Sequence, residues 1–297
     1  MSASDIAKSQ PSILAASPPV GRSVAFRLQP DSDFKSALVR FRETWQLEAG
    51  VVGLGEPAVR AFGKEVPGLS TFPGLSGPAF AVPSTQQALW VFLRGKERGT
   101  LFDATENVRA RLGSSFELHD VMDTFVYAGG RDLTGYEDGT ENPKAEKAAE
   151  AALVSGPSEL AGSSFVAVQR WAHDLKHFRE YSERRRDAII GRKQDTNEEI
   201  ADAPESSHVK RTAQESFDPP AFMWRRSMPW AGAKEQGLEF IAYVESLNRF
   251  DRMLRRMVGL EDGIADALFQ FSRAVTGGYY WCPPVLNGRL DLSYLGL

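Results

Sequence analysis

The sequence predicts an α+β fold of two similar domains, each an antiparallel sheet with helices on one face. Three observations support this prediction. Apolar residues alternate in short runs typical of strands and recur with helical spacing between those runs. The order of strands and helices in the first half of the chain returns in the second half. Between the halves, residues 143–164 are rich in alanine, glutamate, glycine and serine, which is typical of a connection between domains.

The first half reads as strand, helix, strand, strand, helix, strand. Apolar and polar residues alternate over 24–28, which predicts a strand with one buried face. Ser32 can cap a helix whose apolar stripe consists of Phe34, Leu38, Phe41 and Trp45. The other expected elements are strands over 51–54, 88–93 and 116–127, a helix over 101–112 and a long loop over 63–83.

The second half repeats this order with one more helix and a long polar insertion. We expect strands over 165–171, 221–225, 238–244 and 279–282, helices over 174–190, 250–257 and 264–271, and the insertion over 191–215. A duplicated split β-α-β unit, meaning two ferredoxin-like domains, is the simplest interpretation. We place an N-terminal arm at 1–20, the N-terminal domain at 21–145 and the C-terminal domain at 146–297.

Composition argues against several classes of function. The net charge of −4 provides no basic field, so nucleic acid and anionic membrane surfaces are not expected partners. The chain contains no run of about 18 apolar residues, so a membrane span is not expected. The single cysteine, Cys282, cannot form an intrachain disulfide, and the first residues do not resemble a signal peptide. These observations favour a cytoplasmic location.

Residues 135–143, Gly-Tyr-Glu-Asp-Gly-Thr-Glu-Asn-Pro, favour a rigid loop. Gly135 and Gly139 permit backbone conformations that a Cβ disfavours, and Asn142 before a proline is pushed toward extended geometry. Such a loop would present Asp138 at a fixed angle. The alternative is an ordinary surface turn with solvated acids, and a partner for Asp138 elsewhere in the chain decides between the two.

Two later segments contain the other candidate residues. Residues 206–211 include a lone histidine, His208, and residues 223–230 include two adjacent arginines in an otherwise apolar run. A buried arginine needs an anionic partner, and neighbours in a strand point to opposite faces. Arg225 and Ser227 would therefore share one face and Arg226 the other, unless both arginines simply meet water at a strand end.

The remaining histidines give little support to a metal cluster. His173 and His177 are at helical spacing and are expected at the surface.

In order along the chain, the loop with Asp138, then His208, then the Arg225–Trp230 segment closely resemble the B-type dye-decolorizing peroxidases. The N-terminal segment Gln10–Ala15 and the late segment Ala274–Gly277 are similar to that family too. The resemblance covers nearly the whole chain. It implies a haem b (iron protoporphyrin IX) protein with two ferredoxin-like domains and the cofactor in the C-terminal domain.

The resemblance also implies roles for particular residues. His208 would be the proximal iron ligand, and Asp138 and Arg225 would form the distal catalytic pair, with Ser227 adding a hydroxyl or holding a water. Arg225 beside Asp138 should keep the pKa of that carboxyl at or below about 4. The other implied haem contacts are Gly139, Thr140 and Asn142 along its edge, and Arg192, with Lys210 and Arg211 as weaker candidates, at its propionates.

The family usually has an acidic residue that accepts the second N–H of the proximal histidine. The nearest match to that position is Gln270, with Asp266 four residues earlier, and both stay open.

The function that the resemblance implies is reduction of hydrogen peroxide with one-electron oxidation of dye-like, phenolic or other aromatic donors. It also implies a homo-oligomer, a dimer or larger. Trp224, Trp230 and Tyr136 neighbour the inferred site and are candidate relays to bulky donors. Two alternatives are a haem-handling protein that releases iron or stores the cofactor, and a haem-free interaction module. A carrier gains nothing from a distal acid, and a Soret absorption band would exclude the haem-free module.

Overall fold

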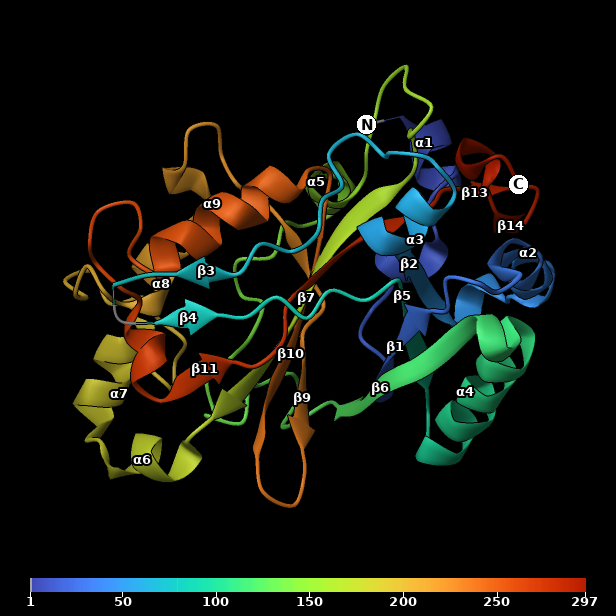
Figure 1. Cartoon of the computed structure of the whole chain (residues 1–297). Coiled ribbons are helices and arrows are strands. Elements are labelled where there is room, and N and C mark those ends of the chain that lie inside the picture. The colour runs from blue at the N-terminus through green and yellow to red at the C-terminus, as the bar shows by residue number, and fades with distance from the viewer. Residues whose placement is uncertain (1, 79) are drawn as a thin grey trace.

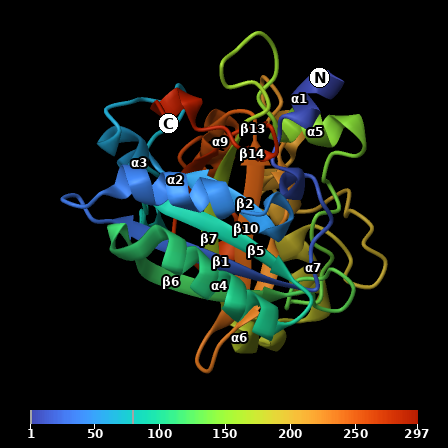
Figure 2. The same ribbon diagram turned by 90° about the vertical axis from the view of Figure 1, so that its right-hand side faces the viewer.

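The N-terminal half is a four-stranded antiparallel sheet in the order β6-β1-β5-β2. The computed structural model describes residues 2–78 and 80–297; residue 1 of the expected arm and residue 79 of the expected loop lie outside this part. Helices α2 and α4 cover the outer face of this sheet (Figures 1 and 2). The elements are α1 (Ala3–Ala7), β1 (Val20–Leu28), α2 (Phe34–Thr44), β2 (Gly50–Leu54), α3 (Glu56–Ala61), β3 (Leu75–Ser76), β4 (Ala81–Val82), β5 (Leu89–Gly95), α4 (Arg98–Leu112) and β6 (Phe116–Phe125).

The C-terminal half repeats the same strand order as β12-β7-β10-β8, with β9 also paired to β10 and β11 to β7. In each half the fourth strand lies beside the first, which is the order of a split β-α-β unit. The elements are α5 (Glu146–Ala152), β7 (Ser164–His173), α6 (Leu175–Glu180), α7 (Glu183–Ile190), α8 (His208–Arg211), β8 (Trp224–Arg225), β9 (Met228–Ala231), β10 (Gln236–Val244), α9 (Leu247–Met257), β11 (Ser272–Ala274), β12 (Gly278–Cys282), β13 (Val285–Leu286) and β14 (Arg289–Leu290).

The two sheets join where β2 pairs with β12, at Leu54 and Trp281. One core cluster holds side chains from both sheets, among them Trp90 and Phe92 of β5 and Val166 and Ile241 of β7 and β10. Both halves therefore share a buried apolar layer in addition to the packing of helices on their sheets. Among the described residues, no helix is both long enough and apolar enough to cross a membrane.

The two ferredoxin-like halves confirm the predicted fold class, and several boundaries differ. The charged helix expected over 174–190 is broken into α6 and α7, because Ser182 accepts a hydrogen bond from the Arg185 N–H and starts a second helix. Asp33, rather than Ser32, caps α2 through the Ser36 N–H. The helix expected over 264–271 is a 3₁₀ turn, Ala267–Gln270. The connection over 143–164 contains α5, and the strand expected over 221–225 keeps only β8.

Candidate functional site

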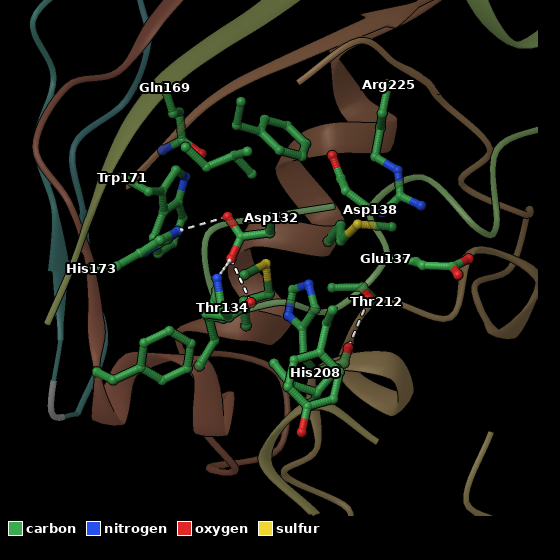
Figure 3. Close-up of a pocket in the computed structure, with 18 of the residues that line it drawn as sticks. Asp132, Thr134, Glu137, Asp138, Gln169, Trp171, His173, His208, Thr212 and Arg225 are labelled. Carbon is green, nitrogen blue, oxygen red and sulfur yellow. Dashed lines mark hydrogen bonds and ion pairs between the residues drawn. The ribbon is translucent and has the colours of Figure 1, made fainter. Parts of the chain in front are cut away.

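A cavity in the C-terminal half has about 880 Å³ of space, counting its open mouth. Its walls are mostly apolar and come from β7, β10, α9 and the loop before α5. The apolar lining residues are Trp171, Ile190, Leu238, Phe240, Phe250, Met253, Met257, Leu268 and Phe271. Polar side chains, including His208, Asp138 and Arg225, gather at particular points of the wall (Figure 3).

The loop that carries Asp138 is a tight hairpin. The Asp132 N–H donates to the Tyr136 carbonyl at 2.9 Å, and the Gly135 N–H donates to the Asp132 carbonyl at 2.8 Å. Gly135 has φ +91° and Gly139 has φ +74°, and a Cβ on Gly135 would collide with the Gln194 amide. The two glycines therefore allow the fixed loop geometry that their positions predicted.

Asp138 and Arg225 line the same part of the cavity, above His208 in the view of Figure 3. Burial raises the pKa of the Asp138 carboxyl above its usual value; the charge of Arg225 opposes this shift, and that of Asp132 adds to it. The expectation that Arg225 holds this pKa at or below about 4 is therefore wrong, because desolvation outweighs the attraction.

Asn142 fixes the backbone of Arg225. Its side-chain oxygen accepts from the Arg225 N–H at 2.9 Å, and its amide donates to the Arg225 carbonyl at 3.1 Å. Asn142 thus ties the Asp138 loop to β8, and its contact with the haem edge stays a prediction. The Arg225 Nε is buried and has no hydrogen-bond partner in the part of the chain that the structure describes.

Arg226 points away from this cavity. Its guanidinium lies over the Trp224 ring at 3.8 Å, and its Nε donates to the Ala15 carbonyl at 2.8 Å. The strand prediction that Arg225 and Arg226 occupy opposite sides agrees with this arrangement. Arg226 is half-buried rather than solvated, and burial lowers its pKa to about 10.

His208 is oriented from behind by an acid. Its Nδ1 lies 2.8 Å from an oxygen of Asp266, whose other oxygen accepts from the Leu268 N–H at 2.8 Å. The Asp266 side chain is fully buried, and a carboxylate only accepts, so Nδ1 carries the proton. The Nε2 of the neutral ring then has the free lone pair. Gln270, the other candidate, instead accepts from Arg185 at 3.2 Å.

His173 is buried, which corrects the expectation of a surface position. It ends β7 instead of lying on a helix, and it lines the cavity with Gln169 and Trp171 (Figure 3). Its Nε2 lies 3.3 Å from Asp132 and its Nδ1 lies 2.7 Å from Ser272. Burial alone would raise the pKa of Asp132, but hydrogen bonds from His173 and Thr134 hold it below the usual value. Gln169, Trp171 and His173 follow one another at intervals of two along β7, and this strand period is the sequence signal that places His173 on the cavity face of the sheet.

The other sequence candidates lie around the cavity without lining it. Ser227 lines an adjoining cavity that also touches Asp138, Gly139, Asn142 and Arg225. Thr140 accepts from Asn197 at 3.0 Å.

The candidate propionate partners all have acidic neighbours. Arg192 pairs with Glu141 and Glu199, Lys210 with Glu205, and Arg211 with Asp262. The three candidate relays are at most partly exposed, with Tyr136 and Trp230 buried.

The model of the Dyp-type peroxidase C-terminal family matches residues 129–287, which include Asp138, His208 and Arg225. The chain belongs to the Dyp-type peroxidase family. The dye-decolorizing peroxidase of Mycobacterium tuberculosis is 31% identical over 262 residues, covering 84% of this chain and 78% of that protein. That of Rhodococcus erythropolis is 32% identical over 244 residues, covering 79% and 72%.

Solved structures of Dyp-type proteins have the same fold. A dye-decolorizing protein from V. cholerae superposes with a TM-score of 0.84 at 30% identity, covering 92% of this chain and 96% of that one. DyPB from Rhodococcus jostii RHA1 gives 0.83 at 27% identity, covering 92% and 94%. A variant of that protein was solved in complex with heme. The narrower B-type assignment stays a prediction.

Proposed function

We propose that this protein is a haem b peroxidase that reduces hydrogen peroxide and oxidises aromatic or dye-like donors by one-electron steps. Membership of the Dyp-type peroxidase family supports the activity. The observation that carries the residue assignment is the placement of an oriented His208 on one side of the cavity and of Asp138 with Arg225 on the other (Figure 3).

The cavity fits haem in its chemistry. Its walls are apolar, as a porphyrin face requires, and the lone pair of His208 Nε2 is a suitable axial ligand. Two side chains that line the cavity, Arg225 and Gln169, each have a buried nitrogen without a hydrogen-bond partner among the described residues, so each can donate to a bound group. When bound, haem supplies the iron at which peroxide is cleaved and the redox capacity to oxidise donors.

Asp266 makes His208 a more basic ligand. A carboxylate that accepts the Nδ1–H fixes the tautomer and the ring orientation and increases electron donation from Nε2. The Asp266 backbone N–H donates to the Met257 carbonyl at 2.8 Å, and the Ala267 N–H donates to the Ser206 carbonyl at 2.7 Å. The histidine and its acid are therefore held by neighbouring backbone as well as by each other.

Asp138 is the proton carrier in this proposal. Cleaving hydrogen peroxide heterolytically requires a proton to leave one oxygen and arrive at the other. A carboxylate with a raised pKa is a stronger base than an ordinary aspartate, so it accepts the first proton more readily at a pH where it is ionised. The rigid hairpin keeps it at one place while the proton is exchanged.

Arg225 stabilises charge on the departing oxygen. A fixed guanidinium donor aimed at developing negative charge is among the largest contributions that a site can make. Ser227, which borders Arg225 in the adjoining cavity, can anchor water or peroxide from that side. We further propose that Arg192 and Arg211 contribute positive potential near the propionates. Each of the two also pairs with acids, Arg192 with Glu141 and Glu199 and Arg211 with Asp262.

The proposal also covers the cellular location and the oligomeric state of the protein. We propose a cytoplasmic location, supported by the single cysteine, Cys282, which is buried and free. We also propose a homo-oligomer, on the family resemblance alone.

Steady-state oxidation of an anthraquinone dye by haem-loaded protein tests the activity. Turnover that requires both hydrogen peroxide and haem is expected. A Soret band without dye or phenol turnover would favour the haem-handling alternative, and no Soret band after haem addition would favour the haem-free module.

A further inference from the structure

The N-terminal segment Gln10–Ala15 has no role in the function described so far, although it is firmly built into the molecule. The Gln10 side chain is fully buried and holds both halves of the fold. Its amide donates to the carbonyls of Val52 at 2.9 Å and Pro283 at 3.1 Å, and its oxygen accepts from the Val52 N–H at 2.8 Å. Val52 belongs to β2 and Pro283 follows β12, so Gln10 fixes the segment where the two sheets meet.

From this anchor the segment reaches the strand that carries Arg225. The Ile13 carbonyl accepts from the Trp224 indole N–H at 2.9 Å, and the Ala15 carbonyl accepts from Arg226 Nε at 2.8 Å. Two carbonyls of the segment, two residues apart, therefore hold the side chains on either side of Arg225 in the sequence. Arg226 also stacks on Trp224 at 3.8 Å, so the two held side chains form one unit.

Arg225 lies between these two residues and points the other way, into the cavity. The strand itself is short: β8 has two residues, paired with Ala242 and Tyr243 of β10, and the Arg226 N–H donates to the Ile241 carbonyl at 2.8 Å. Asn142 holds the Arg225 backbone from the loop side. The N-terminal segment fixes the neighbouring side chains, Trp224 and Arg226, on the opposite side.

We propose that the segment Gln10–Ala15 is a positioning element for Arg225, acting through Trp224 and Arg226. This inference rests on the proposed function, because it assumes that Arg225 serves the distal side of a bound haem. A guanidinium stabilises charge only at the correct place, and a misplacement of about 1 Å can cost roughly 10²-fold in rate. Without the segment, β8 would keep its contacts with β10 and Asn142 but lose the two that fix the side chains of Trp224 and Arg226, which would let Arg225 shift by such amounts.

Fluoride binding to the ferric haem protein measures the position of Arg225 without turnover. A charged donor beside a bound anion contributes about 1.5–3 kcal/mol, so Arg225→Leu should weaken fluoride binding roughly 10- to 100-fold. Gln10→Ala, far from the cavity, and Trp224→Phe, which keeps a ring under Arg226 but loses the indole N–H, should each weaken it by roughly 2- to 10-fold. Arg226→Lys should fall in the same range, because it keeps the charge and loses the Nε donor.

The chain offers a matched control in Gln86. Its side chain also joins the two halves, accepting from the Tyr279 N–H at 2.8 Å and donating to the Tyr279 carbonyl at 2.8 Å, but it does not touch β8. Gln86→Ala should lower the melting temperature as Gln10→Ala does and leave the fluoride affinity unchanged. Trp224→Phe keeps the test decisive if Gln10→Ala fails to fold.

A double-mutant cycle tests whether the segment affects fluoride binding through Arg225. If the segment acts through Arg225, then Gln10→Ala or Trp224→Phe added to Arg225→Leu should cause no further loss of fluoride affinity. Additive losses, or unchanged affinity in both single variants while Arg225→Leu weakens binding, would overturn the positioning role and leave the proposed function intact. If Arg225→Leu itself leaves fluoride affinity unchanged, the distal role of Arg225 is what fails.

Discussion

The Nδ1 of His208 lies 2.8 Å from the buried Asp266 carboxylate, and this contact decides which ring nitrogen faces the cavity. His208→Ala should therefore lose most of its haem, because only apolar burial and peripheral contacts would then hold the cofactor. The ratio of Soret to protein absorbance after haem addition measures this loss. His177→Ala is the control, since His177 is an exposed histidine of the same C-terminal half. Full occupancy with an unchanged spectrum in His208→Ala would remove His208 as the ligand.

Arg225 and Arg226 should differ in their effect on the reaction with peroxide. Arg225→Leu should slow that step by roughly 10² or more, the scale of losing one charge-stabilising donor. Arg226→Leu should slow it much less, because Arg226 faces Trp224 and the Ala15 carbonyl and acts only through its neighbour. Stopped-flow absorbance of the haem band gives both rates. Equal losses in the two variants would contradict the assignment of Arg225, and not Arg226, to the distal side.

The charge of Asp132 should raise the pH below which the reaction with peroxide slows. Asp138 must be ionised to accept a proton, so the rate falls as pH drops below its pKa, which lies above the usual value. The negative charge of Asp132 raises that pKa, so Asp132→Asn should move the acid limb to lower pH. The pH profile of the second-order rate constant measures the shift.

Glu137→Gln is the control for that experiment. Glu137 is the exposed neighbour of Asp138 and pairs with Arg131 at 3.1 Å, so its removal should leave the limb in place. A limb that does not move in Asp132→Asn would show that another group than Asp138 controls it.

The raised pKa of Asp138 also implies a cost in stability. The folded state binds this proton more tightly than the unfolded chain does, so stability decreases as pH rises through the folded-state pKa. Asp138→Asn removes the ionisable group and should melt at a higher temperature than the parent at neutral pH. The difference should vanish in acid, below the unfolded pKa of about 4. A lower melting temperature for the variant at neutral pH would contradict this sign.

Local patterns predicted the fold well, because each half repeats the same alternation of strand and helix spacing. The glycines at 135 and 139 likewise predicted the hairpin, since their positive φ is a property of the local chain. Partners far apart in sequence were harder to predict. Asp266 meets His208 only through the turn after α9. The four-residue spacing of His173 and His177 is typical of a helix, although His173 belongs to β7 and follows the two-residue period of that strand.

The pKa of Asp138 was predicted in the wrong direction for a similar reason. The sequence shows that an arginine is available, but it does not show how much water the folded loop excludes. Burial of the carboxyl dominates in the folded protein, and Arg225 only reduces its effect.

The rate at which haem-loaded Asp138→Asn reacts with hydrogen peroxide tests the central claim most directly. The variant keeps the shape of the side chain and removes the base, so haem occupancy should match the parent. Its second-order rate constant above the acid limb should fall by roughly 10²- to 10⁴-fold, and the limb should disappear. Reaction at the parent rate across the same pH range would show that Asp138 is not the group that moves the proton.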